Sequence, residues 1–518
     1  MKKRLIAVAC ALACGIPGMA GAQTTQEMKQ QIDMLQRQVD ALKARLDNMP
    51  QTQPGTSASQ PATAAAPSGQ GGSFLERKEG DGMVFLTRGG EVQLYGTLDL
   101  SLDSATKGIS GMSTSDGGTP AGNGGWMADI SSNSSFVGLR GFQSFGNSPT
   151  RFVWQLETQI DVSSNSGTAD TNSNTSNVVK GGLTSRNSYI GLASPAWGAV
   201  KIGKTDAPYK NSTAMMNPFS GMWGDYQVIM GNSGGDNRVE FGTRLTHAIW
   251  YESPTWGGFS FSALLSPGQN RADDNSNIPS GEGDCAGGNV PGSGGLPVSC
   301  NDGSFGTAYS ISASYRMPDL YLTAAYEMHR KVNRTSDLGT FDPNDVADET
   351  ASKIGAQYHF RATGTTVSAI YERLRRNVPD SLTWQNERSR NGTWLAISQD
   401  ISSADSLHFG WAHAGRTPGD PGQHNTPGGL NPDNSANMLT VAWKHQVDKN
   451  FQWYVDYATT RNHADAHFDL GAGGRSVTTD CHDAANPDTS GFDPNGGAPH
   501  CWAGGKLQGA SVGARYSF

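Results

Sequence analysis

The sequence predicts an all-β protein, a sixteen-stranded antiparallel transmembrane β-barrel that is preceded by a short helical coiled coil. Two observations carry the barrel prediction. Apolar and polar residues alternate along many short segments, as in strands that have one lipid-facing and one wet face. Short and long connections also follow one another in strict turn, as expected when all turns lie at one membrane face and all loops at the other.

The last ten residues, GASVGARYSF, show the alternation most clearly. Counting back from Phe518, every second residue is apolar, beginning with Tyr516 and Ala514. In lipid, every backbone polar group must be paired within the protein, so the sheet has to close on itself. The strand near 92–103 is therefore expected to pair with the strand that ends at Phe518, and we expect the terminal ring to lie in the interfacial aromatic girdle.

The connections divide residues 92–518 into sixteen strands. Seven short turns are expected near 146–147, 194–197, 253–256, 317–319, 361–364, 402–403 and 448–450. Eight long loops rich in Asn, Gly, Asp and Pro are expected near 104–132, 163–183, 207–240, 267–304, 332–349, 377–389, 417–434 and 463–504. A soluble sandwich has no reason to sort its loops by length in this way.

The N-terminus indicates export. MKKR, the apolar stretch LIAVACALAC and the small residues before Gln23 are typical of a signal peptide over 1–22. The alternative is lipoprotein processing at Cys14, although ALAC matches that motif poorly. Without 1–22 the chain has 36 Lys and Arg against 47 Asp and Glu, a net charge of −11. An acidic exported chain is a poor nucleic-acid binder, and we expect no cofactor.

A heptad pattern precedes the barrel. Residues 23–50 place apolar side chains in alternating steps of four and three, and Pro50 ends the run, which favours a periplasmic coiled coil over a lone amphipathic helix. Residues 51–73 are rich in Pro, Ala, Ser and Gly and are read as a linker, whereas 74–91 have no clear assignment. The expected seam consists of Met28, Ile32, Leu35, Val39, Leu42, Leu46 and Met49.

The four cysteines that remain after export form two local pairs. Cys285 and Cys300 lie in one long loop, and Cys481 and Cys501 lie in another. In an oxidising compartment, two disulfides that staple these loops are the simplest reading. The second pair also has adjoining histidines in Cys481-His482 and His500-Cys501, so a Cys2His2 metal site stays open as an alternative.

Three stretches resemble a known family. TSRNSYIGLASPAWGAVKIGKTDAPY, RLTHAIWYESPTWGGFSFSALLSP and the closing GARYSF are similar to the trimeric Gram-negative general porins, and the resemblance spans about 92–518. It implies a homotrimer in outer-membrane lipid, passive diffusion of ions and small polar solutes, and a third long loop that folds into the lumen. It also implies that Phe518 and Tyr516 serve as a signal for the outer-membrane assembly machinery. The two Cys-bearing loops and the heptads depart from the family pattern.

The family places basic residues on the barrel wall opposite acids on the infolded loop, and low-dielectric walls strengthen the field between them. The matching positions are Arg140, Lys204 and Arg244, while Phe136 stands where the family has a second basic residue. By strand parity Lys201 points inward, whereas Lys204 does so only if a bulge or strand end intervenes. We expect Asp225 to be the loop acid. Each could instead be an ordinary solvated charge.

Three other functions are weighed against a general porin. An enzyme would need a catalytic group, and the best inward pair, Glu327 with His329, has no evident third partner. A barrel that acts mainly as a structural tether through its coiled coil is the second alternative, and a substrate-specific outer-membrane channel is the third. Because inward acids and bases are mixed, the sequence leaves both the preferred solute and the ion selectivity open.

Overall fold

The computed structural model describes residues 83–106, 126–160, 162–163, 184–231, 241–267, 307–333, 346–377, 389–416, 433, 435–463, 466, 468, 470 and 506–518. Within strands β3, β11, β12 and β13, six side chains are excluded from the description. The signal peptide, the coiled-coil seam and the four loop cysteines lie outside the described residues, so these remain predictions. None of the helices in the described part has the length and apolar composition needed to cross a membrane.

The described chain is mostly strand, and its few helical turns belong to one loop. The strands are β1 (Val84–Thr87), β2 (Gly90–Thr106), β3 (Trp126–Ser132), β4 (Phe136–Ser144), β5 (Arg151–Gln159), β6 (Ser188–Ser194), β7 (Gly198–Asp206), β8 (Arg244–Glu252), β9 (Phe259–Pro267), β10 (Thr307–Arg316), β11 (Leu320–Asn333), β12 (Val346–Phe360), β13 (Thr365–Arg376), β14 (Asn391–Asp400), β15 (Asp405–Ala414), β16 (Ala436–Gln446), β17 (Phe451–Asn462) and β18 (Lys506–Ser517). The helical turns are α3 (Pro208–Asn211), η1 (Ala214–Met216) and η2 (Tyr226–Val228).

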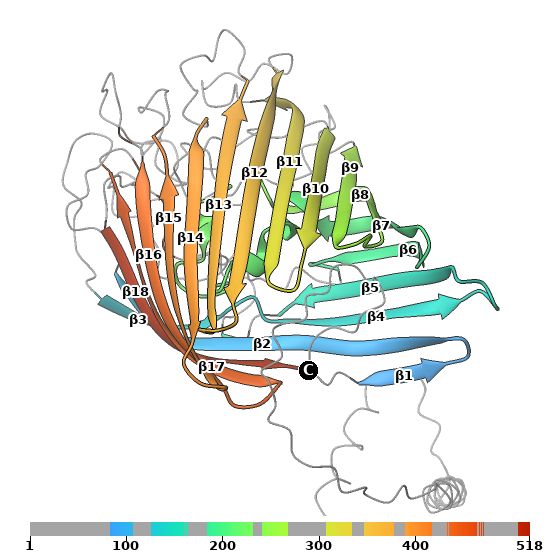
Figure 1. Cartoon of the computed structure of the whole chain (residues 1–518), viewed down its shortest axis with the longest axis horizontal. Helices are drawn as coiled ribbons and strands as arrows, with labels where there is room; N and C mark the ends of the chain where they lie inside the picture. The colour runs from blue at the N-terminus through green and yellow to red at the C-terminus, as the bar shows by residue number, and fades with distance from the viewer. Residues whose placement is uncertain are drawn as a thin grey trace, which may run out of the picture. The chain divides into compact units, whose positions relative to one another are not determined.

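The strands form one closed antiparallel sheet (Figure 1). Each strand pairs with its neighbour in the chain, and β18 pairs with β2, so that Val512 lies opposite Leu102. Strands β3 and β4 both pair with β2 and occupy one position in the wall, interrupted at residues 133–135. With β3 and β4 counted as one and β1 set aside, the wall has sixteen positions. The predicted sixteen-stranded barrel is confirmed.

Strand β1 is an addition that the alternation pattern did not reveal. It forms a hairpin with the first residues of β2, with Phe85 opposite Val92. The C-terminal strand pairs with a later part of β2 and ends where Phe518 exchanges backbone hydrogen bonds with Gly96 at 2.9 and 3.0 Å. The next backbone bond along β2 joins Leu94 to Met83. The hairpin therefore continues the pairing of β2 beyond the chain's last residue, as backbone groups in a barrel require.

The two faces of the wall differ as the alternation predicts. On β2, Leu102 is 64% exposed, whereas the neighbouring Asp103 is 4% exposed. Exposed leucines, isoleucines and valines recur on the same outer face of the other strands. A surface of this kind suits hydrocarbon, which supplies no partners for polar groups.

Connection length also follows the prediction. The strands are joined at one end by short turns, such as residues 361–364 between β12 and β13 and 447–450 between β16 and β17. At the other end the connections are long, and residues 207–243 between β7 and β8 are the best described of them. We call residues 207–243 loop 3, of which 207–231 and 241–243 are described.

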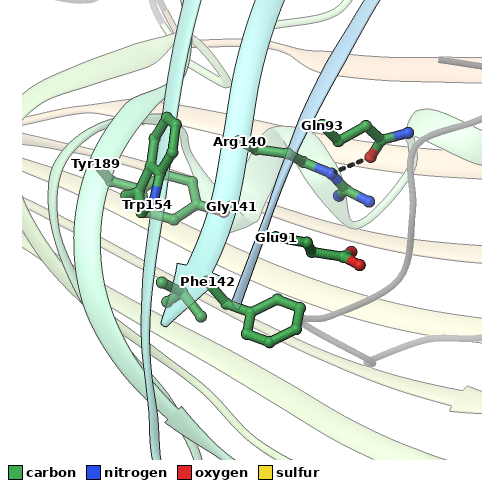
Figure 2. A pocket seen from close by; sticks show the side chains of 8 residues that line it. Glu91, Gln93, Arg140, Gly141, Phe142, Trp154 and Tyr189 are labelled. Atoms are coloured by element: carbon green, nitrogen blue, oxygen red, sulfur yellow. Dashed lines mark hydrogen bonds between the residues drawn. The ribbon is translucent and has the colours of Figure 1, made fainter. Parts of the chain in front are cut away.

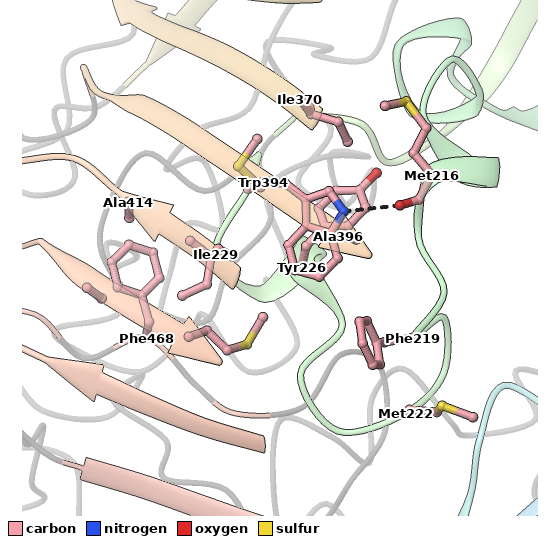
Figure 3. Close-up of a cluster of buried hydrophobic side chains, with 14 of the residues drawn as sticks. Met216, Phe219, Met222, Tyr226, Ile229, Ile370, Trp394, Ala396, Ala414 and Phe468 are labelled. Carbon is pink, nitrogen blue, oxygen red and sulfur yellow. Dashed lines mark hydrogen bonds between the residues drawn. The ribbon is translucent and has the colours of Figure 1, made fainter. Parts of the chain in front are cut away.

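Loop 3 lies inside the barrel. Its side chains Met216, Phe219 and Tyr226 are buried against inward-facing residues of β11 and β13–β17, and the Phe219 ring packs edge-to-face on Trp394 at 5.9 Å (Figure 3). Gly410 makes this approach possible, because an added Cβ would lie 2.3 Å from the Trp394 ring. The infolded third loop that the family resemblance implies is therefore present.

Candidate pore constriction

Loop 3 is fastened to the wall through its own carbonyl groups. Buried carbonyls need a hydrogen-bond donor, and here the wall supplies donors in place of water. Three such bonds run from Trp394 Nε1 to the Met216 oxygen at 3.1 Å, from Lys444 Nζ to the Pro218 oxygen, and from Arg515 Nη2 to the Ser220 oxygen at 2.8 Å. The donors come from β14, β16 and β18, so three strands of the wall hold the stretch from Met216 to Ser220.

Gly224 marks the closest approach of loop 3 to the wall. Thr440 Oγ1 on β16 donates to its carbonyl oxygen at 3.1 Å, and its N–H donates to the Leu470 oxygen at 3.0 Å. The residue has φ +70°, and an added Cβ would lie 1.9 Å from Thr440 Oγ1. Only glycine satisfies both the backbone angle and the contact.

One buried carboxylate holds both ends of the stretch 207–231 of loop 3. Glu372 on β13 accepts from the Tyr209 hydroxyl at 2.6 Å and from the Gly231 N–H at 2.7 Å. Lys353 on β12 lies opposite Glu372 in register, donates to a loop hydroxyl, and places Nζ 4.1 Å from the centre of the Tyr209 ring. Charges this deeply buried persist only with partners, so these side chains form structural anchors.

Asp225 belongs to the loop's internal scaffold. Its carboxylate accepts from Asn217 Nδ2 at 2.7 Å, from the Gln227 N–H at 3.0 Å and from the Gly221 N–H at 3.3 Å, and it caps η2. The residue is 4% exposed, and its burial raises the pKa of the carboxyl above the usual aspartate value. It is therefore placed to fold the loop, and it does not face the basic side chains of the opposite wall.

Arg140 faces the lumen from β4, on the wall that loop 3 leaves uncovered. Its Nε donates to Gln93 Oε1 at 2.8 Å, and its guanidinium lies 5.9 Å from the centre of the Tyr95 ring. Figure 2 shows this pair with Glu91 alongside, toward the turn end of β2. Arg140 therefore places a guanidinium on the pore side of the uncovered wall.

Arg186 covers the position where the family's second basic residue is replaced by Phe136. The Phe136 ring faces inward, and the Arg186 guanidinium lies 4.8 Å from its centre. Arg186 also pairs with Glu157 at 2.7 Å. A base from the end of the second long loop thus supplies the charge that β4 lacks. Sequence reasoning missed this residue because it lies in a loop, where strand parity gives no direction.

Arg244 and Asp206 form the upper end of the basic wall, where β7 leads into loop 3. Arg244 Nη2 lies 3.2 Å from Asp206 Oδ1, and Lys210 Nζ lies 3.1 Å from the same oxygen. Asn187 accepts from Arg244 Nε at 2.8 Å. The Asp206 carboxylate therefore forms ion pairs with both Arg244 and Lys210.

The two predicted lysines of β7 have different surroundings. Lys201 is 5% exposed and pairs with Glu252 at 2.7 Å, with its Nζ 4.6 Å from the centre of the Tyr189 ring. Lys204 lies within a register shift between β7 and β8, and its Nζ donates to the Thr184 carbonyl at 3.0 Å. The structure thus brings Arg140 and Lys201 onto the uncovered wall and ties Lys204 to the end of the second long loop.

The ion pairs of the lumen are unequally exposed. In the pairs Arg186–Glu157 and Arg515–Asp99, the arginine side chains are 18% and 28% exposed, whereas the acids are 4% and 0% exposed. Lys210 and Arg244 are likewise more exposed than Asp206, which they share. Among these described pairs only Lys201–Glu252 has an acid that is more exposed than its base, at 35% against 6%. Arg515 could have been found from sequence, since parity in GARYSF places it on the wet face.

The remaining predicted sites have clear positions. Phe518 ends the closing strand, its ring packs over Gly96, and it stacks with Tyr516 at 5.9 Å. Glu327 and His329 approach to 3.3 Å, but both are almost fully buried between the wall and loop 3, where the Gly242 N–H donates to Glu327. A substrate could reach that pair only if the loop moved.

Comparison with known proteins agrees with this architecture. The family model for the Gram-negative porins matches residues 56–465, well over half of the chain. The anion-selective porin of Comamonas acidovorans is 16% identical, with a TM-score of 0.54 over 83% of this chain and 100% of its own. Salmonella typhi OmpF in complex with daunomycin is 14% identical, with a TM-score of 0.49 over 84% and 100%. None of the curated proteins matches at a significant level.

The closed sixteen-stranded wall, the infolded loop and the family match converge on one assignment. A barrel with an apolar outer face and a polar, charged interior lets ions and small hydrophilic solutes cross the outer membrane by passive diffusion. The chain belongs to the family of Gram-negative porins.

Proposed function

We propose that the pore prefers small anions and that Arg140, Arg186, Arg244 and Arg515 set this preference, together with Lys210. The unequal exposure of the lumen ion pairs carries the proposal. A permeating ion meets the arginine side chains first, while their acids lie behind them. The described part of loop 3 has one acid, Asp225, and it is turned into the loop.

The preference for anions follows from the distance between a permeating ion and each charged side chain of the lumen. Two unit charges 4 Å apart interact by about 1 kcal/mol in water and by more beside a low-dielectric wall. An exposed guanidinium therefore attracts an anion more strongly than the buried carboxylate behind it repels that anion. The similar fold of the anion-selective Comamonas porin is compatible with the proposal.

The test is the zero-current potential of the purified protein in a planar bilayer with a KCl gradient. Anion preference makes the dilute side electrically negative, because chloride crosses faster than potassium. A dilute side that becomes positive would contradict the proposal. Liposome swelling with sugars of increasing size separates a general pore from a substrate-specific channel or a closed tether, since a general pore admits solutes by size alone.

The proposed assembly is a homotrimer in outer-membrane lipid, inserted by the assembly machinery that recognises Phe518 and Tyr516.

Residues 23–50 are proposed to form a periplasmic three-stranded coiled coil, because three linked copies raise the local concentration of the helices. A cysteine in place of Leu35 and a trifunctional thiol crosslinker test this in the full chain. Capture of three chains is expected, and trimeric barrels that never yield three linked chains would exclude it.

A further inference from the structure

The inner face of β4 carries aromatic and basic side chains in turn, on the wall that loop 3 leaves uncovered. Phe136, Arg140 and Phe142 all face the lumen, because they lie opposite inward-facing residues of β2. Two residues along a strand span about 6.6 Å, so the two rings lie about 20 Å apart along the strand, with Arg140 between them. A solute that passes along β4 therefore meets ring, base and ring in turn.

An arginine from a neighbouring segment lies over each of these rings. The Arg186 guanidinium is 4.8 Å from the centre of the Phe136 ring, and the Arg151 guanidinium is 4.5 Å from the centre of the Phe142 ring. Arg151 comes from β5, on the same inner face. A guanidinium is attracted to the face of an aromatic ring, which fixes both side chains. We call these five residues the aromatic–arginine track: Phe136, Arg140, Phe142, Arg151 and Arg186.

The two rings of the track keep part of their surface in the lumen. Other phenylalanines inside the described part of the barrel are buried, with Phe219, Phe241 and Phe468 at 0%, 2% and 0% exposed. Phe136 and Phe142 are only half-buried. An apolar ring that stays partly in water loses the stabilisation that burial would give. A permeating solute with an apolar face can cover this surface and recover that free energy.

Pairs of base and ring beneath loop 3 do not offer such a surface. The Arg316 guanidinium lies 4.9 Å from the centre of the Tyr321 ring, and Lys353 Nζ lies 4.1 Å from that of Tyr209. Both rings are buried, with Tyr321 8% and Tyr209 1% exposed. The accessible combination of ring and base thus lies on the same wall as the exposed cations of the lumen.

A hollow beside the track joins polar and apolar surface. Arg140 and Gln93 contribute its polar groups, whereas Phe142, Val153 and Tyr189 contribute apolar surface (Figure 2). The Phe142 ring is held there by packing on the buried cluster that contains Val153. A small solute that has both a negative group and a flat apolar face matches these surroundings.

We propose that the aromatic–arginine track binds small aromatic carboxylates as they pass through the pore, an inference that rests on the proposed anion preference. The carboxylate accepts hydrogen bonds from Arg140 or Arg186, and the ring packs on the neighbouring phenylalanine. Arg140 and Phe142 are one two-residue step apart, which a single benzene ring bearing a carboxylate can bridge. Glu91 lies opposite Phe142 and also lines the hollow, so repulsion keeps the carboxylate at Arg140 and the ring at Phe142.

The experiment measures how benzoate and cyclohexanecarboxylate block the chloride current through the full-length protein in a planar bilayer. The two anions have the same charge and nearly the same size, but only benzoate is aromatic. Benzoate is expected to halve the current at a concentration about fivefold lower, the gain from one aromatic contact. Equal half-blocking concentrations in the parent would overturn the inference, whether or not any variant folds.

Variants separate the contribution of the rings from that of the bases. F136L/F142L keeps all three arginines, so it is expected to raise the half-blocking concentration of benzoate to that of cyclohexanecarboxylate and to leave the latter unchanged. R140Q is expected to weaken the block by both anions. The control is F409L, which changes an outward phenylalanine of β15 that is 46% exposed, and it is expected to behave as the parent does. An F136L/F142L pore that still prefers benzoate would also overturn the inference.

The zero-current potential in a KCl gradient distinguishes this inference from the proposed function. A parent whose dilute side becomes positive, but which benzoate blocks at the lower concentration, contradicts the anion preference and leaves the aromatic track in place. A parent whose dilute side becomes negative, but which both carboxylates block equally, contradicts the aromatic track alone.

Discussion

Inward charged side chains are buried on one wall of the barrel and partly exposed on the other. We call β10 to β17, which lie behind loop 3, the covered wall, and β2 with β4 to β8 the open wall. On the covered wall Lys353 and Glu372 are 7% and 2% exposed and bind loop atoms. On the open wall Arg186 and Arg244 keep 18% and 20% of their side chains exposed. The same inward charge is thus an anchor under the loop and a pore lining opposite it.

This difference shows that inward parity alone does not define a pore residue. A charge under loop 3 is removed from water, so its partners decide the stability of the loop. A charge on the open wall remains hydrated, and its field acts on permeating ions. Variants that separate stability from selectivity therefore test the comparison.

The largest effect is expected from Trp394→Ala on the covered wall. Trp394 is fully buried, packs on Phe219 and Tyr226, and donates to the Met216 carbonyl. Its removal is expected to lower the free energy of unfolding by about 3–5 kcal/mol, as for other buried tryptophans. Urea unfolding in detergent measures the loss. The control is Trp411→Ala, which truncates an outward tryptophan on β15, and an equal loss in both variants would contradict the comparison.

A comparable but more specific effect is expected from Glu372→Ala. The change leaves the Tyr209 hydroxyl and the Gly231 N–H without their acceptor and Lys353 without its neighbouring carboxylate. Each buried unsatisfied group costs about 1–3 kcal/mol. Loop 3 is then expected to leave its position more often, which single-channel recordings register as more frequent closures.

The matched control for that variant is Glu252→Ala, which removes a partly exposed carboxylate from the open wall. It is expected to leave the closure rate unchanged. The double variant E372A/K353M, which removes the unpaired lysine charge as well, is expected to recover part of the lost stability. If Glu252→Ala raises the closure rate as much as Glu372→Ala, the carboxylate at 372 is not a specific anchor.

The smallest effect in energy is a shift of selectivity in Arg186→Gln. Losing one exposed cation near the ion path is worth about 1 kcal/mol, or roughly fivefold in the ratio of anion to cation permeability. The zero-current potential measures the shift. Lys353→Gln removes the same charge from the covered wall and is expected to destabilise the barrel without shifting selectivity. Equal shifts of the zero-current potential in the two variants would contradict the distinction between the covered and the open wall.

Much of the barrel could be predicted because its signals are local. In β2, the leucines and the intervening Asp99, Ser101 and Asp103 fall on opposite faces as the alternation indicates. The predicted turns and long loops also match the breaks between strands, except that the end of the loop expected over 104–132 forms the strand β3 (Trp126–Ser132), whose seven residues pair with β2. The strand β1 was missed because four residues ending at Thr87, in a charged and glycine-rich segment, show too short a pattern.

The constriction was only partly predictable. The family resemblance placed Arg140 on the barrel wall and strand parity placed Lys201 inward, and the structure puts both on the lumen side. Asp225 was expected to face the basic wall, but its role depends on three donors within loop 3. Arg186 has no periodic context, and its direction follows from Glu157 and Phe136 on other strands.

The sequence by itself determined the barrel, its strand number, the two faces of the wall and the division into turns and loops. These features rest on a period of two residues and on the length of each connection, which neighbouring residues encode. Only the tertiary structure decided which inward charges line the pore. That depends on where loop 3 lies, and its position is set by contacts such as Glu372 with Gly231, 141 residues apart in the chain.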